Sequence, residues 1–304
     1  MDNSWYVIAN GFSNSGKTKK QLPEIEELLK SKEIVYTLAL TKSAGDEIKM
    51  VDLATKQGYN KILGIGGDGT VQKIVAGIMI QKNIPNYEIL FALIPSGTGN
   101  DWAKSKEIPL KANESIDLLK LSKSSFQDVG VVKIINGKEA KTRYFVTYSG
   151  LGFDAFMLQK IDKYKWLGKL SYLACAIMNF MKYKNIEVKI KTTNSEIETK
   201  VFLLGVGICK YTGGGMQLIK NPVGNNGLLN ITIAQEFSKI DVIRNFFNLF
   251  NGAIFKEQKV LTLTDNAVKI SAKNGLLACQ GDGELFGGGK VEYFVIPKGI
   301  RYLC

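Results

Sequence analysis

The sequence predicts two domains of different kinds, an α/β domain with a parallel sheet over residues 1–125 and a mostly antiparallel β domain over residues 126–291. Strand and helix patterns alternate through the first part, which is typical of a parallel sheet covered by helices on both faces. After about residue 125 the patterns change to short strands broken by turns. A chain of 304 residues is long enough for two domains with substantial hydrophobic cores.

The first domain is predicted from its strands and helices in order. Strand patterns cover residues 5–9, 33–40, 61–65 and 87–94, and helical patterns cover 22–31, 45–58, 71–80, a segment that starts near 101, and 112–122. Parallel sheets of this kind bind ligands where the loops leave the carboxyl ends of the strands. We therefore expect the functional loops of this domain directly after its strands.

The second domain is predicted from a series of short strands. They cover residues 127–135, 143–149, 186–191, 200–208, 227–235 and 267–271, and two helical patterns interrupt them at 166–184 and 240–255. This mixture indicates a β domain with two helical insertions.

The composition limits the chemistry. The sequence contains no histidine, and its four cysteines are scattered without a CxxC pair, which argues against a zinc site and against a disulfide framework. Carboxylates, lysines and backbone amides are left to carry any chemistry. The first residues lack the pattern of a signal peptide and the most apolar stretch is too short to span a bilayer, so we expect a cytoplasmic protein.

The formal net charge of +12 indicates either an anionic partner or a surface adapted for solubility. Anionic membrane lipid, nucleic acid and nucleotide are the candidate partners. Because the sequence shows no nucleic-acid-binding motif, we expect no nucleic acid partner.

Three glycine-rich loops each follow a predicted strand and precede a predicted helix. The first, residues 11–18, satisfies the P-loop pattern GxxxxGK[ST], whose backbone amides can hold phosphate while Lys17 adds a positive charge. Short patterns of this kind also occur in ordinary solvated turns. A P-loop NTPase would further need an aspartate at the end of a separate strand, and Asp68 is the available residue.

The second and third loops, residues 64–70 and 95–101, place an acid among small residues. Asp68 lies between glycines, where a carboxylate would repel phosphate unless a metal ion lay between them, so this loop indicates magnesium-bound nucleotide. In the third loop Thr98 offers a hydroxyl, and Asp101 can accept a proton or hold a metal through water. Alternatively, Asn100 or Asp101 only caps the next helix.

These loops and several later motifs resemble the bacterial soluble diacylglycerol kinases and their relatives, the sphingosine and ceramide kinases. The motifs are GGDGT at 66–70, PSGTGND at 95–101, GFDA at 152–155, GGGM at 213–216, NP at 221–222 with GLL at 227–229, and DGE at 282–284. Their order and spacing hold over nearly the whole chain. The set is therefore more specific than the P-loop or the dinucleotide pattern alone.

The resemblance implies an architecture and a set of ligands. The N-terminal domain would be like those of phosphofructokinase and NAD kinase, the C-terminal domain would be an antiparallel β-sandwich, and ATP with Mg²⁺ would bind in the cleft between them. The last strand, residues 292–304, would return to the first domain. A homodimer is a reasonable expectation for the assembly.

The resemblance also implies roles for individual residues. The ATP-binding residues would be Lys17, Thr41, Gly66, Gly67, Gly69, Thr70, Ser96, Gly97, Thr98, Gly99 and Asn100. Asp68 and Asp101 fall on catalytic acidic positions near the triphosphate and the metal, and Asp101 would hold the metal through water. Glu284 falls on the general base, with Asp282 beside it; without the resemblance, residues 282–284 indicate a tight turn between strands.

Three positions depart from the family pattern. Lys73 replaces an acidic residue, Ile208-Cys209 replaces an Asn-Gly pair, and Asn225-Asn226 replaces an acidic pair that helps to hold a structural magnesium ion. Two neutral amides bind such an ion weakly, so we predict that this secondary metal site is absent or altered and that residues 225–227 form only a turn.

The two helical insertions suggest a route to lipid. The pattern at 166–184 is apolar with flanking lysines, and residues 246–255 carry a second aromatic cluster. An apolar face fringed by lysines is typical of a helix at a membrane surface, whereas packing against the β domain is the alternative.

The leading hypothesis is an ATP- and Mg²⁺-dependent kinase that phosphorylates a hydroxyl of diacylglycerol or a related lipid and associates transiently with the membrane. An NAD kinase-like enzyme shares the GGDGT loop and is the first alternative. A nucleotide- or lipid-binding regulator without turnover is the second, motivated by the three departures, and a P-loop NTPase is the third.

Overall fold

The computed structural model describes residues 4–11, 13–121, 123–161, 163–164 and 178–304. The chain forms two compact units, Met1–Val129 together with Ile296–Cys304 (unit 1) and Gly130–Val295 (unit 2). Most of the helix predicted at 166–184 lies outside the described residues.

Unit 1 contains a sheet of parallel strands. β1 (Trp5–Ala9) pairs with β2 (Tyr36–Leu40) and with β3 (Lys61–Gly66), and β3 pairs with β4 (Leu90–Pro95), in each case in parallel. The end of β14 (Glu284–Leu303) joins in parallel beside β4 through Arg301 and Tyr302. The last residues of the chain thus extend the sheet that its first residues begin.

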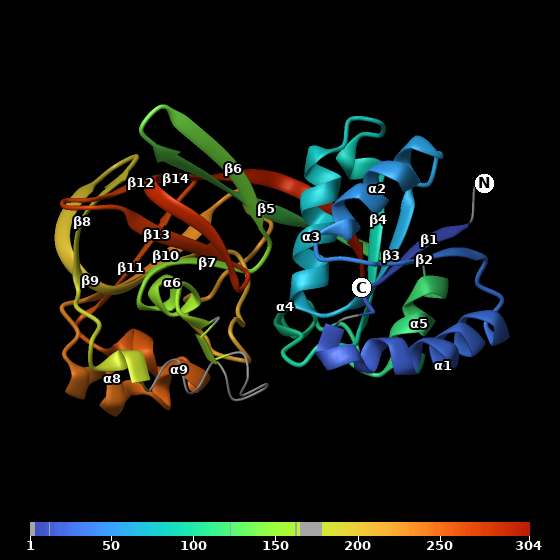
Figure 1. Ribbon diagram of the computed structural model, residues 1–304, viewed down its shortest axis with the longest axis horizontal. Helices are drawn as coiled ribbons and strands as arrows, with labels where there is room; N and C mark the ends of the chain where they lie inside the picture. Colours follow the sequence, from blue (N-terminus) through green and yellow to red (C-terminus); the bar gives the residue numbers. More distant parts are fainter. Residues whose placement is uncertain (1–3, 12, 122, 162, 165–177) are drawn as a thin grey trace. The chain divides into compact units, whose positions relative to one another are not determined.

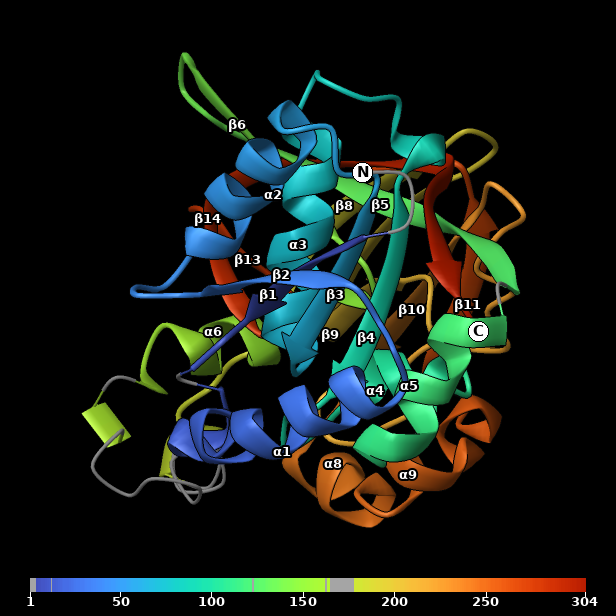
Figure 2. The ribbon, with the colours of Figure 1, turned by 90° about the vertical axis from the view of Figure 1, so that its right-hand side faces the viewer.

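Helices cover both faces of this sheet. α1 (Lys17–Ser31) and α5 (Ala112–Leu121) lie together on one face, and α2 (Asp46–Lys56) and α3 (Asp68–Ile80) lie on the other (Figures 1 and 2). Short helices complete the unit: η1 (Ser13–Gly16), η2 (Asn86–Glu88) and α4 (Asp101–Ser105).

The strand period of two decides which side chains meet which helices. Trp5, Val7 and Ala9 of β1 belong to one buried cluster with Leu29 of α1 and Ile116 of α5. On the opposite face, a Cβ on Gly64 would lie 2.8 Å from the Cδ1 of Ile74 in α3. The missing side chain at Gly64 therefore lets α3 pack closely against the sheet.

Unit 2 is rich in β-structure, as predicted, and its strands are antiparallel. Its strands are β6 (Glu139–Phe145), β7 (Tyr148–Gly152), β8 (Ile186–Thr192), β9 (Glu196–Gly207), β10 (Leu229–Gln235), β11 (Val260–Asp265), β12 (Ala267–Ala272), β13 (Leu277–Gly281), most of β14 and the end of β5 (Ser124–Asn136). The pairings run β9–β7–β13–β14–β12–β8 and return to β9, so these strands form a closed circuit. A buried apolar core lies within it, including Phe145, Leu204, Ile231 and Tyr293.

Two predictions about unit 2 were wrong in detail. A single strand was expected at 143–149, but β6 ends at Phe145 and β7 begins at Tyr148. The backbone N–H groups of Val146 and Thr147, in the gap, donate to the carboxylate of Asp282 instead of to a neighbouring strand.

The helix expected at 240–255 is also broken. It consists of α8 (Lys239–Asn245), α9 (Asn248–Asn251) and the turn of η4 (Ala253–Lys256). The Asn245 side chain donates to the carbonyl oxygen of Asp241 and accepts from Asn248, and Gly252 has a φ of +75° that ends α9. Local polar contacts thus replace the continuous helical pattern.

A further helix of unit 2, α6 (Phe153–Leu158), follows β7 directly. Among the helices in the described part of the chain, none is long and apolar enough to cross a bilayer.

Candidate active site

The carboxyl ends of β3 and β4 carry two of the glycine-rich loops side by side. Gly66 pairs with Pro95 in the parallel register, and the N–H of Ser96 donates to the carbonyl oxygen of Gly66 at 2.8 Å. α3 begins at Asp68 and α4 at Asp101, directly after these loops. In the first turn of α3 the N–H of Thr70 donates to the carbonyl oxygen of Gly67 at 2.9 Å. The start of a helix after a glycine-rich loop is a usual setting of a phosphate site.

Glycine is required where the two loops touch. A Cβ on Gly67 would lie 2.8 Å from the Cα of Gly97, and a Cβ on Gly97 would lie 2.5 Å from the Cα of Gly67. Asn100 has a φ of +52° and closes the loop at 95–101. Its Oδ1 accepts from the N–H of Gly97 and its Nδ2 donates to the carbonyl oxygen of Gly97, both at 3.0 Å. The loops therefore form one compact surface of backbone.

The two predicted acids converge on this surface. The position of a Cβ on Gly99 is 3.0 Å from Oδ2 of Asp68 and 3.6 Å from Oδ2 of Asp101. The other oxygen of Asp68 accepts from the N–H of Trp102 at 2.9 Å, so its carboxylate is fixed, and Asp101 is buried. Thr98 lies exposed at the tip of the same loop.

This pair of carboxylates fits Mg²⁺ better than a metal that needs a full protein cage. Within the described residues no group of three or more His, Cys, Asp or Glu side chains is placed to hold a metal. Mg²⁺ typically takes one or two carboxylates and completes its shell with water and substrate phosphate. The donor set at Asp68 and Asp101 is of that type.

Polar side chains of neighbouring elements support the loop at 64–70 through hydrogen bonds. Asn10, which follows β1, donates to Oε1 of Glu47 at 2.9 Å and to Oγ1 of Thr70 at 3.2 Å. The Thr70 hydroxyl is thus turned into the fold rather than outward. Sequence reasoning missed Asn10 and Glu47, although a polar residue directly after a parallel strand was the available signal for Asn10.

Thr41 lies at the same edge of the sheet, directly after β2. Its N–H donates to the carbonyl oxygen of Ala9 at 3.0 Å, and its side chain is buried. Within the part of the chain that the structure describes, Oγ1 of Thr41 has no hydrogen-bond partner. A buried hydroxyl without a partner is uncommon, so this position is suited to a ligand contact.

The first glycine-rich loop differs from the other two. Lys17 begins α1, but its side chain lies outside the described part of the structure. The hydroxyl of Thr18 is fully buried, 2.8 Å from Oγ of Ser96, and donates to the carbonyl oxygen of Ser13. In a P-loop this hydroxyl would contact the metal ion, so its internal bonds disfavour the P-loop interpretation.

In unit 2, Asp282 and Gly283 form the turn between β13 and β14, with φ of +49° and +83°, and Glu284 is the first residue of β14. The Asp282 carboxylate accepts from the N–H groups of Val146, Thr147 and Tyr148 at 2.7, 2.9 and 3.1 Å, and also from the Thr147 hydroxyl. Burial raises the pKa of Asp282 to about 6, while the donors oppose that shift. Asp282 therefore anchors the β6–β7 connection, whereas Glu284 is exposed.

Asp154 of the GFDA motif is buried at the start of α6. It accepts from the N–H of Ala155 at 2.7 Å, from Nε2 of Gln280 at 2.8 Å and from the Tyr148 hydroxyl at 3.2 Å. Burial raises its pKa. A Cβ on Gly150 would come within 1.7 Å of Oδ2 of Asp154, so the glycine makes room for this carboxylate.

An apolar cavity of about 200 Å³ lies within unit 2 beside Asp154. α6, β9, β10, α8 and α9 contribute to its walls, and Phe153 and Phe202 stack there with ring centroids 5.0 Å apart. The lining residues are Phe153, Asp154, Met157, Phe202, Leu203, Met216, Leu218, Thr232, Ala234, Phe237, Val242, Asn245, Phe246, Leu249, Ile254 and Val260. Among the described residues, the Thr232 hydroxyl in this wall has no hydrogen-bond partner.

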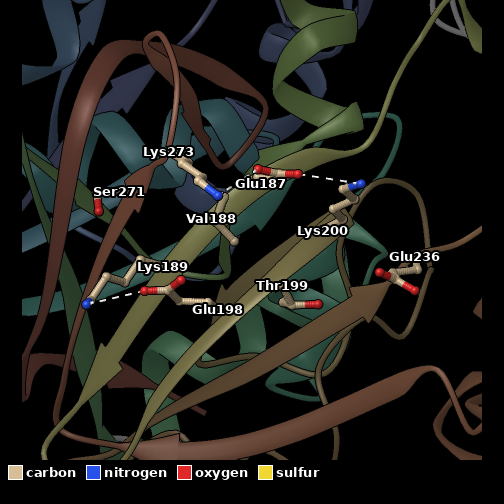
Figure 3. A pocket seen from close by; sticks show the side chains of 9 residues that line it. All are labelled: Glu187, Val188, Lys189, Glu198, Thr199, Lys200, Glu236, Ser271 and Lys273. Atoms are coloured by element: carbon tan, nitrogen blue, oxygen red, sulfur yellow. Dashed lines mark ion pairs between the residues drawn. The ribbon is translucent and has the colours of Figure 1, made fainter.

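A second hollow in unit 2 is lined by charges that pair with one another. Lys189 lies 3.4 Å from Glu198, and Glu187 lies 3.5 Å from Lys200 and 3.6 Å from Lys273 (Figure 3). These charges are exposed and neutralise one another, so the hollow offers little to a charged ligand.

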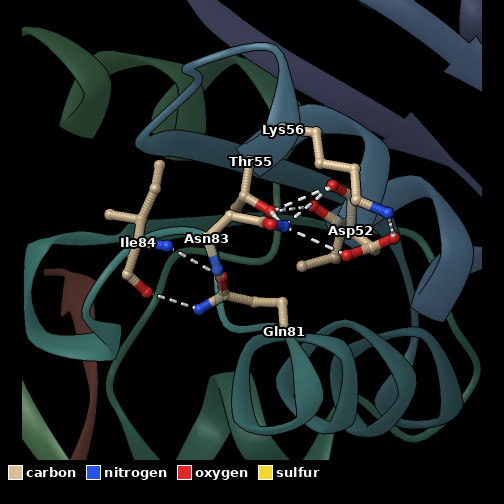
Figure 4. A network of polar contacts seen from close by, with 7 residues as sticks. Asp52, Thr55, Lys56, Gln81, Asn83 and Ile84 are labelled. Carbon is tan, nitrogen blue, oxygen red and sulfur yellow. Dashed lines mark hydrogen bonds and ion pairs between the residues drawn. The ribbon is translucent and has the colours of Figure 1, made fainter.

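A polar network in unit 1 is likewise satisfied internally. Asn83 donates to Oδ1 of Asp52 and to the Thr55 hydroxyl, both at 3.0 Å, while Lys56 pairs with Oδ2 of Asp52 at 2.6 Å (Figure 4). Gln81 bonds the backbone of Ile84 in the same network. The network ties α2 to the connection after α3 and has a structural role.

Of the departures from the family pattern, Lys73 lies within α3, Ile208-Cys209 follows the end of β9, and Asn225-Asn226 lies in a bend. Gly213, Gly214 and Gly215 all have positive φ between the bridged residues Thr212 and Met216. Oδ1 of Asn226 accepts from the N–H of Leu228 at 3.2 Å, and Gly227 has a φ of +73°. Residues 225–227 therefore form a bend that Asn226 stabilises through its own side chain.

Comparison with known proteins finds two family models that match successive parts of the chain. The model of the diacylglycerol kinase catalytic domain matches residues 4–133, and that of the YegS C-terminal NAD kinase beta sandwich-like domain matches residues 147–304. A diacylglycerol kinase of Mycobacterium tuberculosis is 24% identical over 300 residues, covering 98% of this chain and 94% of its own. A protein of Alcanivorax borkumensis named as a YegS-like lipid kinase is 28% identical over 215 residues, covering 70% and 67%.

Among solved structures, a diacylglycerol kinase from Bacillus anthracis str. Sterne superposes with a TM-score of 0.73 at 19% identity, covering 99% of this chain and 96% of its own. This likeness establishes the fold. A diacylglycerol kinase catalytic domain followed by a β-rich domain of the YegS type defines the class of protein, which is a lipid kinase. The chain belongs to the family of bacterial diacylglycerol kinases and YegS-like lipid kinases.

Proposed function

We propose that this kinase transfers the γ-phosphoryl group of ATP to a hydroxyl of diacylglycerol or a related lipid. The observation that carries the proposal is that the carboxylates of Asp68 and Asp101 lie close together beside two loops whose contact at Gly67 and Gly97 leaves no room for a side chain. Phosphoryl transfer needs positioning, neutralisation of phosphate charge and one proton acceptor. In this chain the glycine-rich loops would position the phosphates, the two aspartates would hold the neutralising metal ion, and a further carboxylate would accept the proton.

In this proposal unit 1 is the nucleotide-binding domain, of the phosphofructokinase and NAD kinase kind. Asp68 and Asp101 would hold Mg²⁺, which neutralises triphosphate charge when bound. The glycine-rich backbone at 66–70 and 96–100 would contact the phosphates, with Lys17 and the Thr41 hydroxyl as further ligands. The Thr70 hydroxyl would support the loop and not contact ATP, because it is buried and accepts a hydrogen bond from Asn10.

We assign the role of proton acceptor to Glu284. The sequence contains no histidine, so a carboxylate is the natural base. Glu284 is exposed at the start of β14, directly after the turn formed by Asp282 and Gly283, whereas both oxygens of Asp282 accept backbone N–H groups. Asp282 would therefore position Glu284 rather than take the proton itself.

The apolar cavity favours a lipid over NAD as the acceptor. Its wall is almost entirely aliphatic and aromatic, which suits an acyl chain, and the Thr232 hydroxyl could meet an ester or hydroxyl oxygen of the same molecule. Asp154 also lines the cavity, and its carboxylate is already bonded to Ala155, Gln280 and Tyr148.

The test is transfer of labelled phosphate from ATP to a panel of acceptors in mixed micelles: diacylglycerol, monoacylglycerol, ceramide, sphingosine, phosphatidylglycerol, undecaprenol and NAD. A labelled lipid that requires Mg²⁺ and disappears with Asp68→Asn is the expected result. Labelled NADP without any labelled lipid would overturn the choice of acceptor. Failure to bind ATP would overturn the assignment of the loops.

A further inference from the structure

Large apolar side chains are exposed on α8, on α9 and on the two residues between them. We call Ile240, Ile243, Phe246, Phe247 and Phe250 the apolar ridge. Ile243 is 67% exposed and Phe247 is 78% exposed, although folded proteins usually turn such residues inward. Exposed apolar groups that adjoin one another commonly mark an interaction surface.

The three aromatic rings of the ridge lie close together, and α8 has a capped start. The ring of Phe246 lies 5.4 Å from that of Phe247 and 5.8 Å from that of Phe250, measured between centroids. α8 begins with a capping box, in which Ser238 and Asp241 each bond the other's backbone. Asp241 also pairs with Lys259 at 2.7 Å, so its charge is neutralised.

The opposite side of the same helices lines the apolar cavity. Val242, Asn245 and Leu249 belong to the cavity wall, whereas Ile240, Ile243 and Phe247 do not. Phe246 belongs to both, since it is 46% exposed and also lines the cavity. Phe246 is therefore shared between the exposed ridge and the wall of the cavity.

Basic residues border the ridge. Nζ of Lys239 donates to the carbonyl oxygens of Phe180 and Tyr183, which fastens residues 178–184 beside the start of α8. This neighbouring segment adds the exposed Met178 and Met181 and the exposed Lys182 and Lys184. Residues 178–184 and 236–259 together carry six basic and three acidic side chains, a balance that favours an anionic partner.

We propose that the apolar ridge is the surface by which this protein docks on anionic lipid bilayers, with Ile240, Ile243 and Phe247 in the acyl region and the bordering cations at the headgroups. Amphipathic helices with this distribution lie in the plane of the interface. The docking itself is independent of the reaction. Entry of a lipid past Phe246 into the cavity rests on the proposed function.

The test compares two variants with closely matched exposure. Ile243→Ser removes a ridge side chain, and Val35→Ser removes one of 65% exposure in unit 1. Binding is measured by sedimentation with vesicles of phosphatidylcholine and phosphatidylglycerol in equal parts and with phosphatidylcholine alone. Melting temperatures of all variants serve as the control for folding.

The wild type is expected to bind the anionic vesicles more tightly than the neutral ones. Ile243→Ser should weaken binding to the anionic vesicles, and Ile243→Ser combined with Phe247→Ser should weaken it by about tenfold or more, since each substitution removes an apolar contact with the bilayer. Val35→Ser should leave vesicle binding unchanged. Phe247→Asp should weaken vesicle binding more than Phe247→Ser does, because the added carboxylate is repelled by anionic headgroups. Phosphorylation of a short-chain diacylglycerol dissolved as monomers should persist in the ridge variants.

Equal vesicle binding by the wild type and the double variant would overturn the inference, as would equal binding to neutral and anionic vesicles. If the wild type is instead a dimer that the double variant dissociates, with vesicle binding unaltered, the ridge is a contact between two copies. Failure to phosphorylate any lipid would count against the proposed function alone, because vesicle binding is measured without ATP.

Discussion

The carboxylate of Asp68 accepts a hydrogen bond from the backbone N–H of Trp102, at 2.9 Å. This bond joins the start of α3 to the first turn of α4. Trp102 is fully buried, and its indole N–H donates to Gln127 at 2.8 Å, so the backbone that holds Asp68 is itself fixed from the core. One oxygen of Asp68 is therefore structural, and the other faces Gly99 and Asp101.

Two substitutions at Asp68 should separate these functions. Asp68→Asn keeps an oxygen that can accept from Trp102, so the melting temperature is expected to stay within about 2 °C of the wild type. Its loss of charge should still lower phosphoryl transfer by at least about 100-fold. Asp68→Ala should lower both, measured by labelled phosphate transfer and thermal unfolding. Equal melting temperatures for the two variants would show that the bond to Trp102 does not matter for stability.

The loop glycines offer a matched pair. Gly97→Ala places a Cβ 2.5 Å from the Cα of Gly67, so the loops must separate, and we expect a loss of about 1–3 kcal/mol in the free energy of unfolding. Gly69→Ala meets nothing within 4 Å and lies in α3, where alanine should add up to about 1 kcal/mol. If Gly69 contacts phosphate, its variant should lose ATP affinity while remaining stable. Calorimetric titration with ATP, alongside urea unfolding, checks both.

Glu284→Gln tests the base. The side chain is exposed, so the variant should unfold at the wild-type temperature while turnover falls by at least about 100-fold with little change in ATP affinity. Asp282→Asn should instead lower the unfolding temperature. An amide cannot accept from both Val146 and Thr147 in the same orientation, so stability should fall first.

Asp282 also predicts a pH dependence of stability. Its pKa of about 6 in the folded protein lies above the usual 3.8, so the folded state holds this proton more tightly than the unfolded state. Its contribution to the free energy of unfolding is therefore greatest below about pH 4 and falls as pH rises through 6. Urea unfolding between pH 4 and 8 should show this slope in the wild type and lack it in Asp282→Asn. Parallel profiles for the two proteins would contradict the assignment.

Substitution of Thr232, in the wall of the apolar cavity, is expected to stabilise the protein, whereas several of the substitutions above destabilise it. Thr232→Val removes a buried hydroxyl that has no partner among the described residues, so we expect about 1 kcal/mol of added stability and weaker lipid binding. Thr55→Val is the control, because that buried hydroxyl donates to the carbonyl oxygen of Val51 at 2.9 Å. The control should lose stability and keep its lipid kinetics. A Thr232→Val enzyme with unchanged KM for lipid would place the acceptor elsewhere.

Patterns local in sequence predicted much of unit 1. The strand at residues 5–9 has the predicted bounds, and residues 66–70 and 95–101 do follow neighbouring strands. Alternation of strands and helices decides these features within short stretches of chain. The contact of Gly67 with Gly97 was beyond such reasoning, because it depends on how two loops approach each other.

Unit 2 was harder for a physical reason. The division of β6 from β7 depends on Asp282, more than 130 residues further along the chain. The aromatic cluster at 246–255 divides between two environments that its pattern does not distinguish: Leu249 and Phe255 pack against a buried cluster, and Phe247 is exposed. Contacts of high sequence separation decide both.

The path of β14 has a consequence for how the protein is made. Arg301 and Tyr302 pair with β4, and Leu303 packs in the core that Trp5 and Val7 begin. The ribosome makes this segment after all of unit 2, so the N-terminal unit waits for the whole of unit 2 to be translated before its sheet is complete. Truncated products of interrupted translation would lack that strand, and the nucleotide loops would then sit on an unfinished scaffold.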